Sequence, residues 1–187
     1  MVSVTALWLP ILVATVFVFI TSNLIWMVFQ LHKKDWKPLP DEEAFREVMN
    51  RQELPVAEYS FPFSAGPEDW KSEEWQKKFK EGPVGFLTVM PSGNMNMGKS
   101  MACWLAYIVV IQVFIAYLTG LSRPGGAEFM DVFRVAGATG VLGFAGAVAP
   151  EAIWLGRRWG NVLRTMRDGI LYGLVSAAAF AWLWPGA

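Results

Sequence analysis

ALWLPILVATVFVFITSNLIWMVFQL, residues 6–31, contains no charged side chain, and HKK follows it at residues 32–34. About 20 consecutive apolar residues suffice to cross the hydrocarbon core of a bilayer. The run is longer than the apolar part of a secretory signal peptide, and no basic residue precedes it. Residues 6–31 therefore predict a membrane-spanning helix rather than a cleaved signal.

Three further apolar runs follow, at residues 101–121, 132–155 and 169–184. Hydrophobic residues make up 54% of the chain and charged residues 17%, and the mean hydropathy is +0.34. This composition is too apolar for an ordinary soluble domain of this length. We predict an all-α membrane protein with four transmembrane helices and a short cytoplasmic segment, partly helical and partly irregular, over residues 33–98.

The basic residues are sorted between the loops. Fourteen of the 16 Lys and Arg lie after the first apolar run or between the third and the fourth. Only Arg123 and Arg134 lie near the loop that joins the second and third runs. Because basic residues are retained on the cytoplasmic side during insertion, this sorting predicts that residues 33–100 are cytoplasmic and that both termini lie outside.

Small residues recur at helical spacing in the last two apolar runs. Gly140 and Gly143 lie in the third run, and Gly169, Gly173 and Ala177 recur every fourth residue in the fourth run. Small side chains on one face let two helix backbones approach closely in lipid. We predict these five residues to be helix-packing positions, either between the two helices themselves or toward another subunit.

Residues 33–98 form the polar part of the chain, with 9 basic against 12 acidic side chains. Three consecutive acidic residues favour a short helix over 41–50, because negative charge suits a helix N-terminus. A second helix is predicted over 68–80, with Gly82 and Pro83 as its stop. The short apolar run that follows, bracketed by Gly and Pro, predicts a strand or an extended interfacial loop.

Aromatic side chains line one face of the second predicted helix. Trp75 and Phe79 are four residues apart, and Trp70 lies near them. Such a stripe can rest on lipid headgroups or pack on the rest of the segment. We predict Trp70, Trp75 and Phe79 to form an interface.

Residues 93–100 formally match the phosphate-binding pattern G-x-x-x-x-G-K-S. That motif needs a strand before it and a soluble helix after it, with access for a nucleotide. Here the helix that follows is a predicted membrane span. We therefore interpret Lys99 as an interfacial anchor rather than as a nucleotide ligand.

The chain is poor in metal- and haem-binding side chains. His32 is the only histidine and Cys103 the only cysteine. A zinc site or a two-histidine haem site therefore cannot form within one chain, and we predict no metal site. His32 is a weak candidate for binding a chlorophyll-type pigment or a haem, but its place at the basic end of a span favours an interfacial polar residue. Cys103 is expected to be a small buried apolar residue.

Few ionisable or strongly polar residues lie within the predicted spans. Glu151 follows Pro150, whose ring can kink a helix, and Asp168 begins the fourth span. We expect both acids to pair with arginines at the inner surface, at positions 157, 158 or 164. Only Gln112 and Ser176 lie near mid-membrane, and no catalytic set stands out.

Six blocks of the sequence resemble a family of small bacterial four-helix integral membrane proteins without assigned function. The blocks are LPDE (39–42), GPVGFLTVMPSG (82–93), MGKS (97–100), VFR (132–134), IWLGR (153–157) and DG (168–169). The resemblance covers most of the chain and implies location in the bacterial inner (cytoplasmic) membrane. It implies no catalytic residue.

Three functions remain open. The first is a non-catalytic accessory subunit of a larger membrane complex, plausibly photosynthetic or respiratory, with membrane lipids and other membrane subunits as its partners. Such a subunit would have no cofactor of its own, but would share lipid, quinone or pigment contact with its partners. The second is a small oligomeric transporter or channel, and the third is an enzyme that uses Glu151, Asp168 and the arginines on a lipid headgroup. The net charge of zero excludes recruitment of nucleic acid by a global field.

Overall fold

The computed structural model describes residues 1–186 and is mostly helical, as the sequence predicts. The chain divides into two compact units. One consists of Met1–Trp36 together with the chain from Asn96 onward, and the other is Lys37–Met95. The first unit therefore includes a few residues at each end of the predicted cytoplasmic segment.

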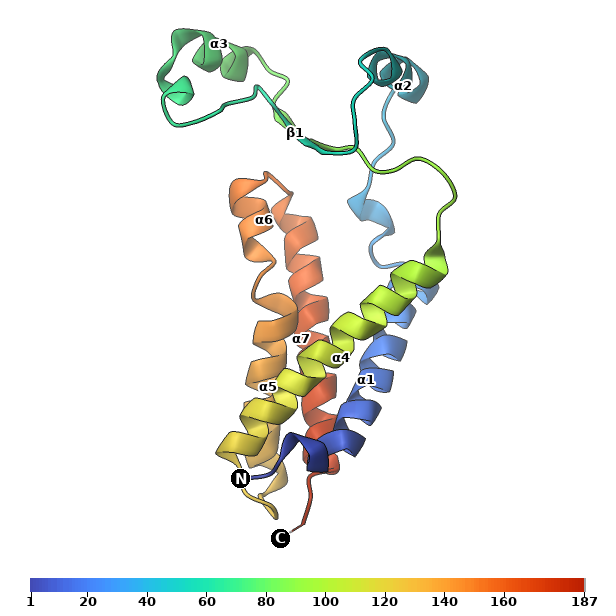
Figure 1. Ribbon diagram of the computed structural model, residues 1–187, viewed down its shortest axis with the longest axis vertical. Helices are drawn as coiled ribbons and strands as arrows, with labels where there is room; N and C mark the ends of the chain where they lie inside the picture. Colours follow the sequence, from blue (N-terminus) through green and yellow to red (C-terminus); the bar gives the residue numbers. More distant parts are fainter. Residues whose placement is uncertain (187) are drawn as a thin grey trace. The chain divides into compact units, whose positions relative to one another are not determined.

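The first unit is a bundle of helices (Figure 1). The N-terminal helix begins as a 3-10 turn, continues as α1 and ends as a π-helical turn. The helices of the bundle are Val4–Leu7 (3-10), α1 (Trp8–Asn23), Leu24–Val28 (π), Lys33–Asp35 (3-10), α4 (Met97–Ser122), α5 (Phe129–Ala145), α6 (Ala149–Trp154) and α7 (Trp159–Trp182).

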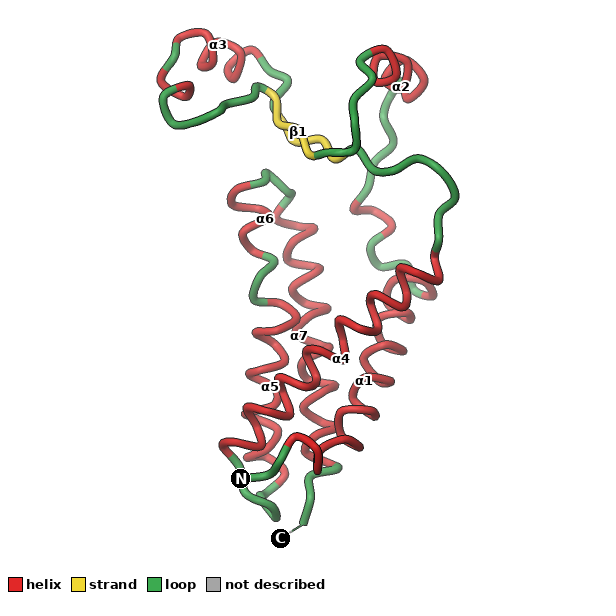
Figure 2. Tube along the Cα trace, in the orientation of Figure 1, coloured by secondary structure: helices red, strands yellow, loops and turns green. Residues whose placement is uncertain are grey.

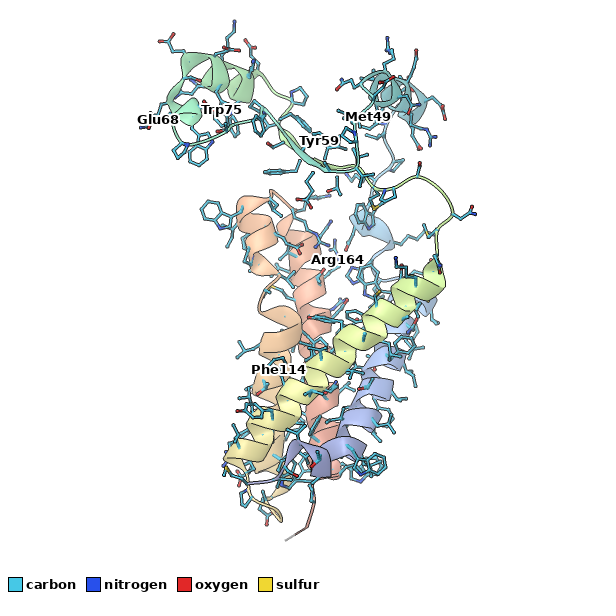
Figure 3. The ribbon with its side chains drawn as sticks, in the orientation of Figure 1. Met49, Tyr59, Glu68, Trp75, Phe114 and Arg164 are labelled. Atoms are coloured by element: carbon cyan, nitrogen blue, oxygen red, sulfur yellow. The ribbon has the colours of Figure 1, made fainter. Side chains whose placement is uncertain are left out.

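Three helices are long and apolar enough to cross a membrane: Val4–Val28, Met97–Ser122 and Phe129–Trp154. The first two are apolar on all sides and leave large hydrophobic side chains uncovered, such as Phe17 on α1 and Phe114 on α4 (Figure 3). A helix that is apolar all round and still exposed is typical of a surface in contact with lipid. The structure is thus compatible with a multi-pass membrane protein. The fourth helix, α7, has 24 residues but carries Arg164, Arg167 and Asp168.

Helices α5 and α7 pack most closely, through glycines. A Cβ at Gly140 would lie 2.8 Å from the Cα of Gly173. A Cβ at Gly173 would lie 2.6 Å from the backbone nitrogen of Val141, and one at Gly169 would lie 2.6 Å from the carbonyl oxygen of Phe144. No side chain fits at these distances, so the contact of the two backbones requires glycine.

The other two predicted packing positions differ in their partners. Ala177 is fully buried, and a Cβ at Gly137 would be in van der Waals contact with it. A Cβ at Gly143 would instead lie 3.1 Å from the side chain of Ile111. Gly143 therefore faces α4 and not α7.

Backbone hydrogen bonds close one end of the bundle, where both termini lie (Figure 1). The Val2 N–H donates to the carbonyl oxygen of Gly120, and the Gly126 N–H donates to that of Pro185. The N-terminal segment, the α4–α5 loop and the C-terminal segment are therefore tied together.

Pro150 marks a break at the opposite end of α5. That helix ends at Ala145, and α6 begins at Ala149 with Pro150 in its first turn. Backbone N–H groups of a first turn have no partner within the helix, so the missing N–H of proline costs no helical hydrogen bond there. Glu151 pairs with Arg157, as expected. The expectation that Asp168 pairs with Arg157, Arg158 or Arg164 is wrong, because Asp168 pairs with Arg167 and His32 instead.

The second unit contains α2 (Glu42–Arg51), β1 (Glu58–Phe61), a 3-10 turn (Asp69–Lys71), α3 (Glu73–Glu81) and β2 (Gly85–Thr88). The strands pair antiparallel, with Tyr59 opposite Leu87 (Figure 2). This sheet corrects the expectation of an all-α chain. The predicted helix 68–80 is divided at Ser72, because the Ser72 hydroxyl accepts a hydrogen bond from the Trp75 N–H and starts a new helix there.

Candidate functional site: a buried Asp–His–Asp chain beside a cavity

His32 lies between two carboxylates in the bundle and is only 3% exposed. Its Nδ1 lies 2.7 Å from Oδ2 of Asp35, one turn further along the chain. Its Nε2 lies 2.5 Å from Oδ2 of Asp168, on α7. The side chains of both acids are 4% exposed. The three residues thus form a continuous hydrogen-bonded chain that is shielded from water.

Hydrogen-bond counting fixes how many protons this chain holds. An ionised carboxylate only accepts, so each of the two contacts to His32 needs one proton. With both carboxylates ionised, both ring nitrogens donate and the imidazole is positively charged. If one carboxylate holds a proton instead, the ring is neutral. In either state the Asp35–His32–Asp168 chain holds two protons, and one of them can shift along it.

Arginines neutralise both ends of the chain. The Arg164 guanidinium donates to Oδ1 of Asp35, and its Nε–Oδ1 distance is 2.7 Å. Figure 3 labels Arg164 on α7. Arg167 donates to Oδ1 of Asp168 at 2.8 Å. Asn161 adds a hydrogen bond to the backbone oxygen of Asp35 at 3.0 Å, which ties the 3-10 turn Lys33–Asp35 to α7.

These partners set the pKa of Asp35. Burial alone would raise the pKa of this carboxyl. The hydrogen bonds from Arg164 and His32, together with their positive charge, outweigh burial and hold the pKa below its ordinary value of 3.8. Asp35 is therefore ionised at neutral pH although it is buried.

The π-helical turn Leu24–Val28 positions the ring of Trp26 on that of His32. The two ring centroids are 3.9 Å apart and the planes differ by 3°. π-Helical turns within longer helices are frequent at functional sites, because they redirect side chains that an α-helix would place elsewhere. This stacking covers one face of the imidazole.

A cavity of about 560 Å³ lies beside this chain, within the bundle. Its walls are mostly apolar and aromatic, and Asp168 forms part of its lining. The lining residues are Ser22, Asn23, Trp26, Met27, Ser100, Met101, Trp104, Tyr107, Phe144, Thr165, Asp168, Gly169 and Tyr172. Small-molecule sites are typically cavities of about 300–1,000 Å³ with apolar walls and a few polar groups, so the cavity has the size and the character of a ligand site.

One wall of the cavity holds an unsatisfied donor. Tyr172 is 5% exposed, and its hydroxyl has no hydrogen-bond partner. The Trp26 indole N–H is the nearby polar group, and since an indole only donates, the hydroxyl hydrogen of Tyr172 has no acceptor. The Trp104 indole N–H, by contrast, donates to the Ser22 hydroxyl at 2.9 Å. A buried polar group normally has a partner, so Tyr172 can bind an acceptor that enters the cavity.

Deeper in the bundle, the two polar residues expected near mid-membrane contact each other. The Gln112 amide donates to the Ser176 hydroxyl at 2.8 Å, and both side chains are fully buried. The Gln112 Oε1 atom and the Thr119 hydroxyl have no partner. This pair ties α4 to α7.

The predicted site residues fall in different places. His32 is a buried member of the Asp35–His32–Asp168 chain. Cys103 is exposed and not buried. In the second unit the Trp75 and Phe79 rings stack at 4.9 Å, and Trp70 is 55% exposed. Trp75 is labelled in Figure 3.

Sequence reasoning missed most of the cavity. Trp26, Trp104 and Tyr172 were not singled out, and Asp168 was expected to meet only arginines. One signal was present in the sequence. Polar residues lie at 161, 165, 168, 172 and 176, a spacing that places them on one face of a helix. A polar stripe inside an apolar bundle indicates a functional interior.

Comparisons with protein-family models, with curated proteins and with solved structures find no match. In the part of the chain that the structure describes, no group of His, Cys, Asp and Glu side chains is arranged to hold a metal ion.

Proposed function

We propose that this protein is a four-span membrane protein that binds an uncharged amphipathic small molecule in its cavity, as a non-catalytic accessory subunit of a larger membrane complex. The observation that carries the proposal is the aromatic cavity of about 560 Å³ with a buried polar chain at its edge. Apolar walls suit the body of such a ligand, and a few fixed polar groups orient its head.

The position of the site favours a ligand that partitions into the membrane. Trp26, Met27 and Tyr107 line the cavity and are 46%, 47% and 43% exposed. The cavity therefore reaches the outer surface of the bundle, on the α1 and α4 side. A surface of this kind would face lipid, so the ligand would enter from the bilayer.

The proposed topology treats α7 as the fourth span. Its 24 residues correspond to about 36 Å at 1.5 Å per residue, enough for a hydrocarbon core of about 30 Å. Arg164 and Arg167 lie in its first half, near the end where the chain is basic. We propose that this end faces the cytoplasm of a bacterial cell and that both termini lie outside the inner membrane.

A role within a larger assembly is supported by the exposed aromatic side chains of the second unit. Trp70 is 55% and Phe79 is 48% exposed. Exposed aromatic groups are enriched at protein interfaces. We propose that Trp70, Trp75 and Phe79 contact a partner subunit, and that the partner belongs to a respiratory or photosynthetic complex.

Native mass spectrometry after extraction in mild detergent tests both parts of the proposal. We expect the wild-type protein to retain a small molecule and to migrate with other membrane chains. Ser100→Trp places an indole at an exposed position of the cavity wall and should release the small molecule without loss of folding. Tyr117→Trp, also on α4 but away from the cavity, is the matched control. Wild-type protein that carries no small molecule after the mildest extraction, and takes none up when added, contradicts the proposal.

The second candidate function is a small oligomeric transporter or channel. The buried Gln112–Ser176 pair favours it, because polar side chains within a membrane bundle often line a pathway. We expect protein reconstituted alone into vesicles to show no solute uptake and no ion leak above empty vesicles. Saturable flux that disappears in Gln112→Leu would establish the transporter instead.

A further inference from the structure

Aromatic rings form much of the apolar wall of the cavity. Trp104 and Phe144 approach Tyr172 edge-on, with ring centroids 6.2 Å and 5.8 Å away. Trp104 also stacks on Tyr107 at 5.4 Å. Aromatic pairs favour offset-stacked and edge-to-face arrangements, and a further flat ring adds to such a cluster with favourable geometry. The walls therefore suit a planar ring better than a branched or bulky head.

The charges at the cavity exclude an anionic head. Among the lining residues that the structure describes there is no Lys or Arg, and Asp168 supplies the only charge. Both oxygens of that carboxylate already accept hydrogen bonds, one from His32 and one from Arg167. A phosphate would meet a carboxylate and no cation, so a phospholipid headgroup does not fit.

The polar groups define what the head of the ligand must offer. The unpartnered Tyr172 hydroxyl needs an acceptor, and a carbonyl oxygen is the uncharged acceptor that a planar ring most readily carries. Asp168 lies in the same lining and connects through His32 and Asp35 to Arg164. Both carboxylate oxygens of Asp168 already accept hydrogen bonds, so the Tyr172 hydroxyl is the group that is free to orient the head.

These requirements, which rest on the proposed ligand-binding function, converge on one chemical class. We propose that the cavity binds a quinone: a planar ring whose carbonyl oxygen accepts a hydrogen bond from the Tyr172 hydroxyl, on an apolar tail that leaves the bundle between Trp26 and Tyr107. Binding alone is proposed, since an electron donor would have to come from a partner.

The test is a titration of the purified full-length protein with decylubiquinone and with a short-chain menaquinone, read by quenching of tryptophan fluorescence. We expect saturable quenching, because Trp26 and Trp104 line the cavity. Tyr172→Phe removes only the hydroxyl and should weaken binding about tenfold, the effect of one hydrogen bond. Tyr117→Phe is the matched control, because Tyr117 is an exposed tyrosine of α4 that does not line the cavity. It should bind as the wild type does.

A competitor without a ring distinguishes the quinone assignment from the more general proposal that the cavity binds an amphipathic molecule. Decanol at equal concentration should not displace the quinone. If decanol binds as tightly as decylubiquinone, and Ser100→Trp abolishes both, the quinone assignment fails while the amphiphile site stands. If neither compound binds, or if Ser100→Trp does not change binding, the proposed ligand-binding function fails together with the quinone assignment. Equal quinone affinity in Tyr172→Phe and the wild type also overturns the assignment of the donor.

Discussion

His32 joins two carboxylates that are far apart in the chain, since Asp168 is 136 residues away. The contact fastens the end of the first helix to α7. A buried pair that loses one partner leaves an uncompensated charge and destabilises the fold. The first prediction concerns this contact.

Asp168→Ala should lower the free energy of unfolding by about 3 kcal/mol, because it leaves His32 without its Nε2 partner in a buried place. The measurement is chemical or thermal unfolding in detergent. Glu74→Ala removes the exposed pair with Lys78 and should leave the midpoint unchanged. Equal midpoints for Asp168→Ala and the wild type would show that the Asp–His–Asp chain does not hold the bundle together.

The low pKa of Asp35 predicts a dependence of stability on pH. A folded-state pKa below 3.8 means that the stabilising contribution is complete above that value and is lost as pH falls through the folded-state pKa. The thermal midpoint should therefore fall more steeply below about pH 4 in the wild type than in Asp35→Asn, which has no such carboxyl to titrate. Glu58→Gln, on an exposed strand position, should keep the wild-type profile. If the thermal midpoints of the wild type and Asp35→Asn depend on pH in the same way, ionised Asp35 does not stabilise the fold.

At the residue scale the sequence predicted only part of the site. His32 and Asp35 are three residues apart and could have been paired from the sequence alone. The partner on α7 could not, because only the packing of α1 against α7 brings Asp168 to the ring. Tyr172 was overlooked because an aromatic residue in an apolar run is usually a packing residue.

Among the contacts between helices, the contact of α5 with α7 requires glycine at particular positions. Gly173→Ala should destabilise the protein by about 2 kcal/mol, the scale of overpacking in a tight core, because its Cβ would lie 2.6 Å from the Val141 nitrogen. Gly160→Ala on the same helix is the control, since its nearest neighbour is Nη1 of Arg164 at 3.7 Å. Alanine there should be neutral or slightly stabilising, because glycine disfavours a helix. Similar midpoints for the two variants would show that the glycines are incidental.

The apolar runs predicted where helices lie because length and hydropathy are local properties. Their bounds differ, because α7 begins at Trp159 rather than at residue 169 and the third run is divided into α5 and α6. The strand Glu58–Phe61 was not predicted, because four residues carry too little pattern. The division of the helix at Ser72 follows from a local competition. A serine hydroxyl can cap a helix as readily as it can sit inside one, and the sequence does not say which wins.

For the whole molecule, the spans and the sorted charges lead to a topology that labelling can decide. In a Cys103→Ser background, Glu128→Cys should react with a membrane-impermeant maleimide on intact cells, since it lies in the loop after α4. Lys71→Cys should react only after permeabilisation, because the basic residues place its segment inside. The two positions are both exposed, so accessibility in the folded chain does not distinguish them.

The pattern of labelling also tests α7 as a span. Val2 is hydrogen-bonded to Gly120 at the end of α4, and Pro185 is hydrogen-bonded to Gly126 in the α4–α5 loop. A cysteine at Gly186 should therefore react from outside together with Glu128→Cys, and one at Arg158, at the start of α7, should not. If Arg158→Cys reacts on intact cells while Lys71→Cys stays protected, neither the α5–α6 segment nor α7 crosses the membrane. In that case the buried Asp–His–Asp chain would lie outside the lipid. Entry of a ligand into the cavity from the bilayer would then be ruled out together with the proposed topology.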